Sequence, residues 1–75
     1  MVYNFLHMSE KQLGKAIKQA REKAGLTQEA LAQNVGVHVS YLSRLERGVE
    51  KNPTKEVLEG IGRILKMKAS DLLAL

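Results

Sequence analysis

A group of polar side chains lies in the middle of the chain, at His38, Ser40, Ser43, Arg44 and Arg47. Leu42 and Leu45 keep helical spacing among them, so a helix here would bury the leucines and turn the polar groups outward. Imidazole, hydroxyl and guanidinium groups donate or accept hydrogen bonds at the edges of DNA bases and at phosphates. These residues are therefore the first candidates for contacts to a nucleic acid.

A second helix is expected directly before this one. Leu31 and Val35 have helical spacing, and Gly36 can adopt the positive φ that ends a helix tightly. Ala32 stands where the two helices would pass closest, and its small methyl group allows that approach. Residues 28–47 therefore predict two short helices joined at one sharp corner, a helix-turn-helix.

Three further helices are expected around this motif. Ser9 and Gln12 match a capping box, which starts a helix that Gly25 ends. Thr54 is the expected cap of a helix that follows Pro53, and residues 70–75 form a last helical turn or two. The core faces are apolar residues at three- and four-residue steps: Leu13, Ala16, Ile17, Ala20 and Ala24 in the first of these helices, and Val57, Leu58, Ile61, Ile64 and Leu65 in the second. The predicted fold class is all-α, with five helices.

Two glycines, Gly60 and Gly62, lie inside the helix that follows Thr54. Each costs about 0.5–1 kcal/mol relative to alanine in a helix interior. Either they allow another helix to pack closely or this segment is locally weak, and the sequence leaves both interpretations open.

Length and charge limit the class of protein. The 75 residues fit one small domain at residues 9–75, after a leader at residues 1–8 whose native, disordered or cloning-derived nature stays open. Twelve Lys and Arg outnumber eight Asp and Glu, and the net charge of +4 favours an anionic partner. The apolar run over residues 72–75 is far shorter than the roughly 18 residues of a membrane span. We expect a cytoplasmic domain that does not enter a membrane.

No set of catalytic side chains is recognisable. The chain has no cysteine, and its two histidines, His7 and His38, are far apart in sequence. Acidic residues stand beside lysines or on polar helix faces, where solvated ion pairs are expected. The sequence therefore predicts no enzyme, no metal site and no cofactor.

Three segments keep the spacing of a known kind of domain: LTQEALA at residues 26–32, VGV at 35–37 and YLSRLERG at 41–48. In these segments, and in the proline-opened helix after them, the chain resembles the Cro and lambda-repressor (Xre-type) family of helix-turn-helix DNA-binding domains. The resemblance covers residues 10–75. It implies a lambda-repressor-like transcriptional regulator that binds double-stranded DNA, with residues 38–47 as a recognition helix in the major groove.

The resemblance assigns base contacts to four residues: His38, Val39, Ser40 and Arg44. Arg44 is the strongest candidate, because a guanidinium can bond guanine O6 and N7 together, which is worth about 1–3 kcal/mol of discrimination. Val39 either contacts a thymine methyl group or is an ordinary exposed valine. His38, like Lys68 before the last helix, stands where the family often has a Ser or Thr cap, so both helix starts are weakly specified.

Phosphate contacts are expected at the edge of the same surface. Gln28 matches a family position where the side-chain amide and the free N–H groups of a helix N-terminus meet a phosphate. Weaker phosphate candidates are Tyr41, Ser43, Arg47 and Lys51. For Arg47 and Lys51 the alternative is a solvated surface charge.

One pair of residues is expected to stabilise the domain, and a separate group is expected to form a dimer interface. Arg21 and Glu46 match family positions that often form a salt bridge, which would fix the recognition helix. A domain this small contacts few bases, so a homodimer on a pseudo-palindromic operator is expected. Its candidate interface residues, for which ordinary core is the alternative, are Met67, Leu72, Leu73 and Leu75.

A protein-interaction module, such as an antitoxin or an adaptor, is the alternative function, because the same fold can bind a partner protein. Gln28, Ser40 and Arg44 on the groove face favour DNA, since an adaptor has no need of them. A regulatory protein partner is compatible with either function.

Overall fold

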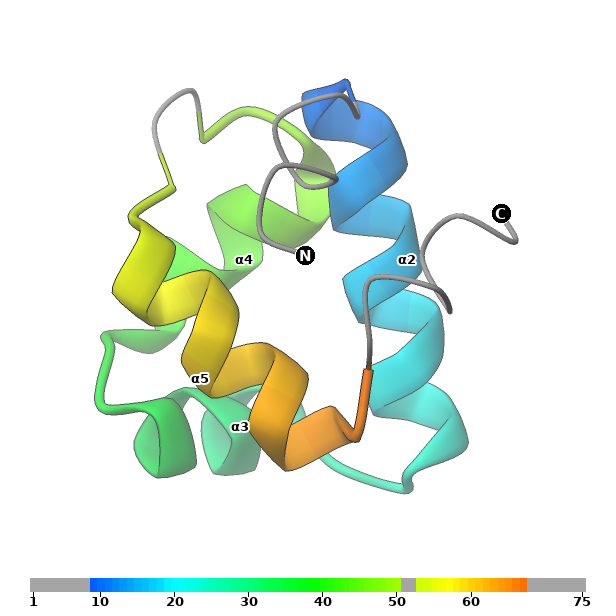
Figure 1. The fold of residues 1–75 in the computed structure, drawn as a ribbon, viewed down its shortest axis with the longest axis vertical. Coiled ribbons are helices and arrows are strands. Elements are labelled where there is room, and N and C mark those ends of the chain that lie inside the picture. Colours follow the sequence, from blue (N-terminus) through cyan, green and yellow to red (C-terminus); the bar gives the residue numbers. More distant parts are fainter. Residues whose placement is uncertain (1–8, 51–52, 68–75) are drawn as a thin grey trace.

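The computed structural model describes residues 9–50 and 53–67. These ranges contain the helices α2 (Glu10–Lys23), α3 (Gln28–Val35), α4 (Val39–Arg47) and α5 (Lys55–Leu65), and they contain no strand (Figure 1). The all-α fold class agrees with the sequence. The expected helix at residues 70–75 lies outside the described ranges, so the count of five helices is not confirmed.

Each of the four helices begins at a residue that caps it with its own side chain. Ser9 and Gln12 form a complete capping box before α2. Thr27 Oγ1 accepts a hydrogen bond from the Ala30 N–H at 3.0 Å, and Thr54 Oγ1 accepts one at 3.1 Å in the first turn of α5. These bonds satisfy N–H groups that a helix start otherwise leaves without a partner.

Glycine ends both helices of the motif. Gly36 follows α3 with φ 89°, and Gly48 follows α4 with φ 79°. This left-handed conformation is open to glycine and costly for residues with a Cβ atom. The chain therefore turns sharply at both positions, and the first turn brings α4 back against α3.

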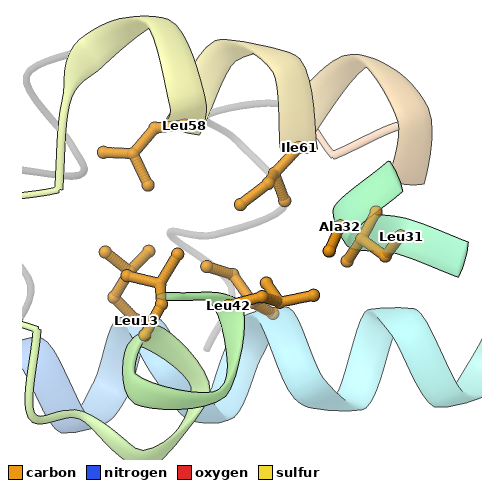
Figure 2. Packing of buried hydrophobic residues seen from close by; sticks show 8 residues of the cluster. Leu13, Leu31, Ala32, Leu42, Leu58 and Ile61 are labelled. Carbon is orange, nitrogen blue, oxygen red and sulfur yellow. The ribbon is translucent and has the colours of Figure 1, made fainter. Parts of the chain in front are cut away.

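The core lies between the four helices, with α4 packed against α2 and α3, and α5 packed against α3 and α2. Leu58 and Ile61 point from α5 toward Leu13 and Leu42 (Figure 2). The buried cluster consists of Leu13, Ile17, Leu31, Ala32, Leu42, Leu45, Leu58 and Ile61. Ala24, expected in this core, is exposed, because it caps the C-terminus of α2 beyond the last turn that packs.

One buried glycine allows α2 and α4 to approach closely, and a second lies between α5 and α3. A Cβ atom at Gly14 would meet the backbone carbonyl groups of Leu45 and Glu46 at under 3.0 Å, so α2 and α4 are almost in backbone contact there. Gly60 is buried on α5, and a Cβ atom there would lie 3.5 Å from Val35 Cγ1 of α3. This is an ordinary van der Waals distance, so an alanine methyl would fit there and the packing of α5 on α3 does not require glycine at this position.

Candidate nucleic-acid interface

One face of α4 is buried and the opposite face is exposed. Its buried residues are Leu42, Leu45 and Glu46. Ser40, Arg44 and Arg47 recur at steps of four and three residues and are all exposed, while His38 is exposed at the helix start. The fold therefore gathers three of the four base-contact candidates on one accessible side of the motif.

His38 caps α4 with its imidazole ring. Its Nδ1 accepts a hydrogen bond from the Ser40 backbone N–H at 3.1 Å, and Ser40 Oγ lies 2.8 Å from the same nitrogen. Because a backbone N–H can only donate, Nδ1 is the acceptor and the neutral ring carries its proton on Nε2. His38 thus presents one donor, Nε2–H, and the Ser40 hydroxyl, which donates to Nδ1, keeps lone pairs for a donor on another molecule.

Arg44 is held by one edge of its guanidinium. Its Nε donates to Glu50 Oε1 at 3.1 Å, and its Cζ lies 5.8 Å from the centre of the Tyr41 ring. The guanidinium makes no other hydrogen bond within the described part of the chain. Nη1 and Nη2 therefore keep their donors for another molecule. Glu50 carries no sequence signal for this contact beyond its place after the Gly48 turn.

The Tyr41 side chain lies under Arg44 and is half-buried. Its hydroxyl is buried and has no hydrogen-bond partner among residues 9–50 and 53–67. Burial raises the pKa of Tyr41 above 10.0, and the nearby backbone of Thr54 offsets part of that rise. A phosphate contact from this hydroxyl would require the side chain to move outward.

A buried ion pair fixes α4 to α2. Arg21 Nε and Nη2 donate to the two carboxylate oxygens of Glu46 at 2.7 and 3.1 Å, and Arg21 Nη1 donates to the Leu26 carbonyl at 2.7 Å. The side chains are 11% and 1% exposed. Hydrogen bonding to Glu46 raises the pKa of Arg21 above its ordinary value, against the opposing effect of burial. This is the salt bridge that the resemblance implies.

Gln28 joins the same network. Its Nε2 donates to Glu46 Oε1 at 2.9 Å, so the side-chain amide that was expected to meet a phosphate is engaged inside the protein. Three helices, α2, α3 and α4, consequently meet at one carboxylate. The pose of α4 depends on Glu46 because that carboxylate accepts hydrogen bonds from both Arg21 and Gln28.

The remaining candidates lie on or beside α4. Val39 is half-buried and packs against the core cluster, and Ser43 is half-buried. Arg47 is exposed, and its Nε donates to the Ser43 carbonyl at 3.3 Å. Lys51, Leu72, Leu73 and Leu75 lie outside the described residues, and Met67 is half-buried after α5.

Metal-binding clusters and membrane-spanning helices are absent from the described ranges. They contain no group of three His, Cys, Asp or Glu residues that could hold a metal ion. Among the same residues, no helix has the length and apolar character to span a bilayer.

Comparison with known proteins gives a consistent result. A family model described as Helix-turn-helix matches residues 17–72. The HTH-type transcriptional regulator SinR of Bacillus subtilis (strain 168) is 38% identical over 61 residues, which are 81% of this chain and 55% of SinR. The chain therefore spans only about half the length of that relative.

Solved structures share the fold. The clp gene regulator ClgR from Corynebacterium glutamicum superposes with a TM-score of 0.81 at 31% identity, covering 89% of this chain and 70% of ClgR. SinR in complex with DNA gives a TM-score of 0.73 at 38% identity, covering 81% of this chain and 97% of that one. SinR in complex with SinI gives 0.74 at 38% identity, covering 81% and 59%. The matched residues and the shared fold show that the chain belongs to the lambda-repressor-like helix-turn-helix family.

Proposed function

We propose that this protein is a sequence-specific regulator of transcription that places α4 in the major groove of double-stranded DNA. The exposed face of α4 carries the proposal, because its polar groups keep hydrogen-bonding capacity. Arg44 has Nη1 and Nη2, His38 has Nε2–H, and Ser40 has oxygen lone pairs. The major groove displays the acceptors and donors that match such a set. SinR, which shares the fold, has been solved in complex with DNA.

Phosphate contacts would position α4 on the duplex. Gln28 contributes through the N–H groups in the first turn of α3, since its side-chain amide is engaged by Glu46. Arg47 keeps its exposed position beside the base-contact face. Ser43, Tyr41 and Lys51 stay weaker candidates for the same role.

A homodimer on a pseudo-palindromic operator would supply the specificity that one domain lacks. Two copies would read half-sites about 34–36 Å apart. The proposed interface combines Met67 with Leu72, Leu73 and Leu75, an apolar group near the end of the chain.

Selection of bound sequences from random duplex DNA tests the proposal. We expect an enriched inverted repeat. The logarithm of the protein's binding constant for this duplex should fall steeply and linearly with the logarithm of the salt concentration. Arg44→Ala should abolish the enrichment at one position of each half-site, whereas Arg63→Ala on the exposed side of α5 should leave it unchanged. Recovery of no motif at low salt would reject DNA recognition.

Protein binding is the second candidate function. SinR has also been solved in complex with SinI, so a relative with this fold binds a protein partner. If the second function holds alone, the purified chain binds duplex DNA only weakly and without sequence preference. The selection experiment would then yield no sequence motif, while a protein partner would still be captured.

A further inference from the structure

Two arginines of this protein use their guanidinium groups in different ways. Arg21 donates from Nε, Nη1 and Nη2, all to acceptors inside the protein. Arg44 donates from Nε alone to Glu50 Oε1, and its side chain is 45% exposed. A guanidinium held by Nε presents its opposite edge, with Nη1 and Nη2, to whatever approaches α4.

The turn at Gly48 places Glu50 beside Arg44. The Gly48 N–H donates to the Leu45 carbonyl at 3.1 Å, and the Val49 N–H donates to the Arg44 carbonyl at 3.0 Å. This pair of bonds is a Schellman motif, which folds the chain back over the last turn of the helix. These bonds fix the backbone up to Val49, directly before Glu50, and the Glu50 side chain is only 22% exposed.

A second contact limits rotation of the guanidinium. Arg44 Cζ lies 5.8 Å from the centre of the Tyr41 ring, within the range of a cation–π interaction. Tyr41 is itself anchored, because its hydroxyl is buried and its ring packs against the core cluster. One contact fixes an edge of Arg44 and the other lies beneath it, so the side chain is preorganised before any ligand binds.

We infer that Glu50 is a specificity-determining positioning residue, which aims the Nη1 and Nη2 edge of Arg44 at guanine O6 and N7. The inference rests on the proposed function and deepens it. Bidentate recognition of guanine needs two donors in one plane at a set direction. A flexible arginine loses side-chain conformational entropy when it adopts that geometry on binding, and this weakens the affinity. An arginine that is already held loses less.

Competition by Glu50 for the same donors is the opposing interpretation. A competing carboxylate would take two donors from one edge of the guanidinium, as Glu46 does with Nε and Nη2 of Arg21. Glu50 instead takes Nε alone, through one oxygen. The observed contact therefore leaves the guanine-reading edge open.

The test compares guanine discrimination in wild type, Glu50→Gln and Glu50→Ala. Binding is measured by fluorescence anisotropy on the selected duplex and on one whose Arg44-dependent guanine pair is replaced. Glu50→Ala should lower the ratio of the two affinities about 3- to 10-fold, by freeing the side chain. Glu50→Gln, whose amide oxygen can still accept from Nε, should retain most of the ratio. Glu59→Gln, an equal charge change on the exposed side of α5, should not alter it.

Two further measurements separate positioning from charge or folding. In an Arg44→Ala background, Glu50→Ala should no longer change discrimination, because Glu50 acts through Arg44. All variants should melt within a few degrees of wild type, since an exposed ion pair adds little stability. Unchanged or increased discrimination in Glu50→Ala would overturn this inference alone. Loss of all guanine-specific binding in wild type would overturn the proposed function and the inference together.

Discussion

At the scale of single residues, the surroundings of a charged group decide what it does. Arg21 is buried, and its guanidinium is bonded to Glu46 and to the Leu26 carbonyl, so its role is structural: it links α2 to α4. Arg44 is exposed and bonded at one edge, so it remains available for recognition. Nothing in the arginine side chain itself distinguishes these roles.

Arg21→Ala should destabilise the fold before it affects specificity. The substitution leaves the Glu46 carboxylate, which is 1% exposed, without its charged partner, at a cost of about 3–5 kcal/mol. That is comparable to the whole stability of a domain this small. Thermal unfolding followed by circular dichroism measures the loss, with Arg63→Ala as the matched control.

Replacing both partners provides a further check on this pair. Arg21→Met combined with Glu46→Leu should melt closer to wild type than Arg21→Ala does, because no buried charge is left unpaired. A normal melting temperature for Arg21→Ala together with lost DNA binding would contradict the structural role.

Tyr41 should make stability fall in alkaline solution. Burial raises its pKa in the folded state above 10.0, so the unfolded chain loses the phenolic proton at a lower pH than the folded chain. This contribution is fully present below about pH 10 and is lost as the pH rises through the folded pKa. In urea titrations from about pH 8 to about pH 10.5, wild type should lose stability relative to Tyr41→Phe. Parallel curves for the two proteins would show that the hydroxyl titrates as it does in the unfolded chain.

At the scale of helices, glycine has opposite consequences at two buried positions. Gly14 stands where α2 meets the backbone of α4, whereas a Cβ atom at Gly60 would lie at an ordinary contact distance from Val35 Cγ1 of α3. Intrinsic helix propensity favours alanine at both positions. Packing decides the sign of the stability change, because a methyl group would overlap backbone carbonyls at Gly14 but would make an ordinary contact at Gly60.

Gly14→Ala should destabilise the protein by about 1–3 kcal/mol, since the new methyl group overlaps the carbonyls of Leu45 and Glu46. Gly60→Ala is its matched control, with the methyl at an ordinary distance of 3.5 Å from Val35 Cγ1. Gly60→Ala should stabilise by about 0.5–1 kcal/mol. Urea denaturation of both variants gives the change in the free energy of unfolding relative to wild type. Changes of the same sign in the two variants would refute the packing argument.

At the scale of the whole molecule, the proposed operator requires two copies of the chain. Removing residues 72–75 should weaken the homodimer and, with it, cooperative binding to the two half-sites. Analytical ultracentrifugation measures the assembly, and anisotropy with one and two half-sites measures the cooperativity. Leu72→Ala with Leu73→Ala is a milder variant, expected to act in the same direction. A dimer that survives the truncation unchanged would remove these residues from the interface.

Much of the architecture follows from signals within a few residues of one another. Side-chain caps at Ser9, Thr27 and Thr54, and glycines after α3 and α4, mark the helix ends as expected. His38 is the exception, because an imidazole replaces the usual hydroxyl cap and bonds the Ser40 N–H all the same. These features are local, so the sequence contains both the donor and the acceptor within one helical turn.

What the sequence determined by itself is therefore the helix-turn-helix, its core and the side chains that α4 turns outward. Tertiary structure alone decided that Gln28 bonds Glu46, that Tyr41 buries its hydroxyl and that Gly14 lies against a neighbouring backbone. Glu50 also reaches Arg44 only after the Gly48 turn has folded back. The physical reason is that helical periodicity fixes which way a residue points, whereas its partner depends on which other segment is packed there.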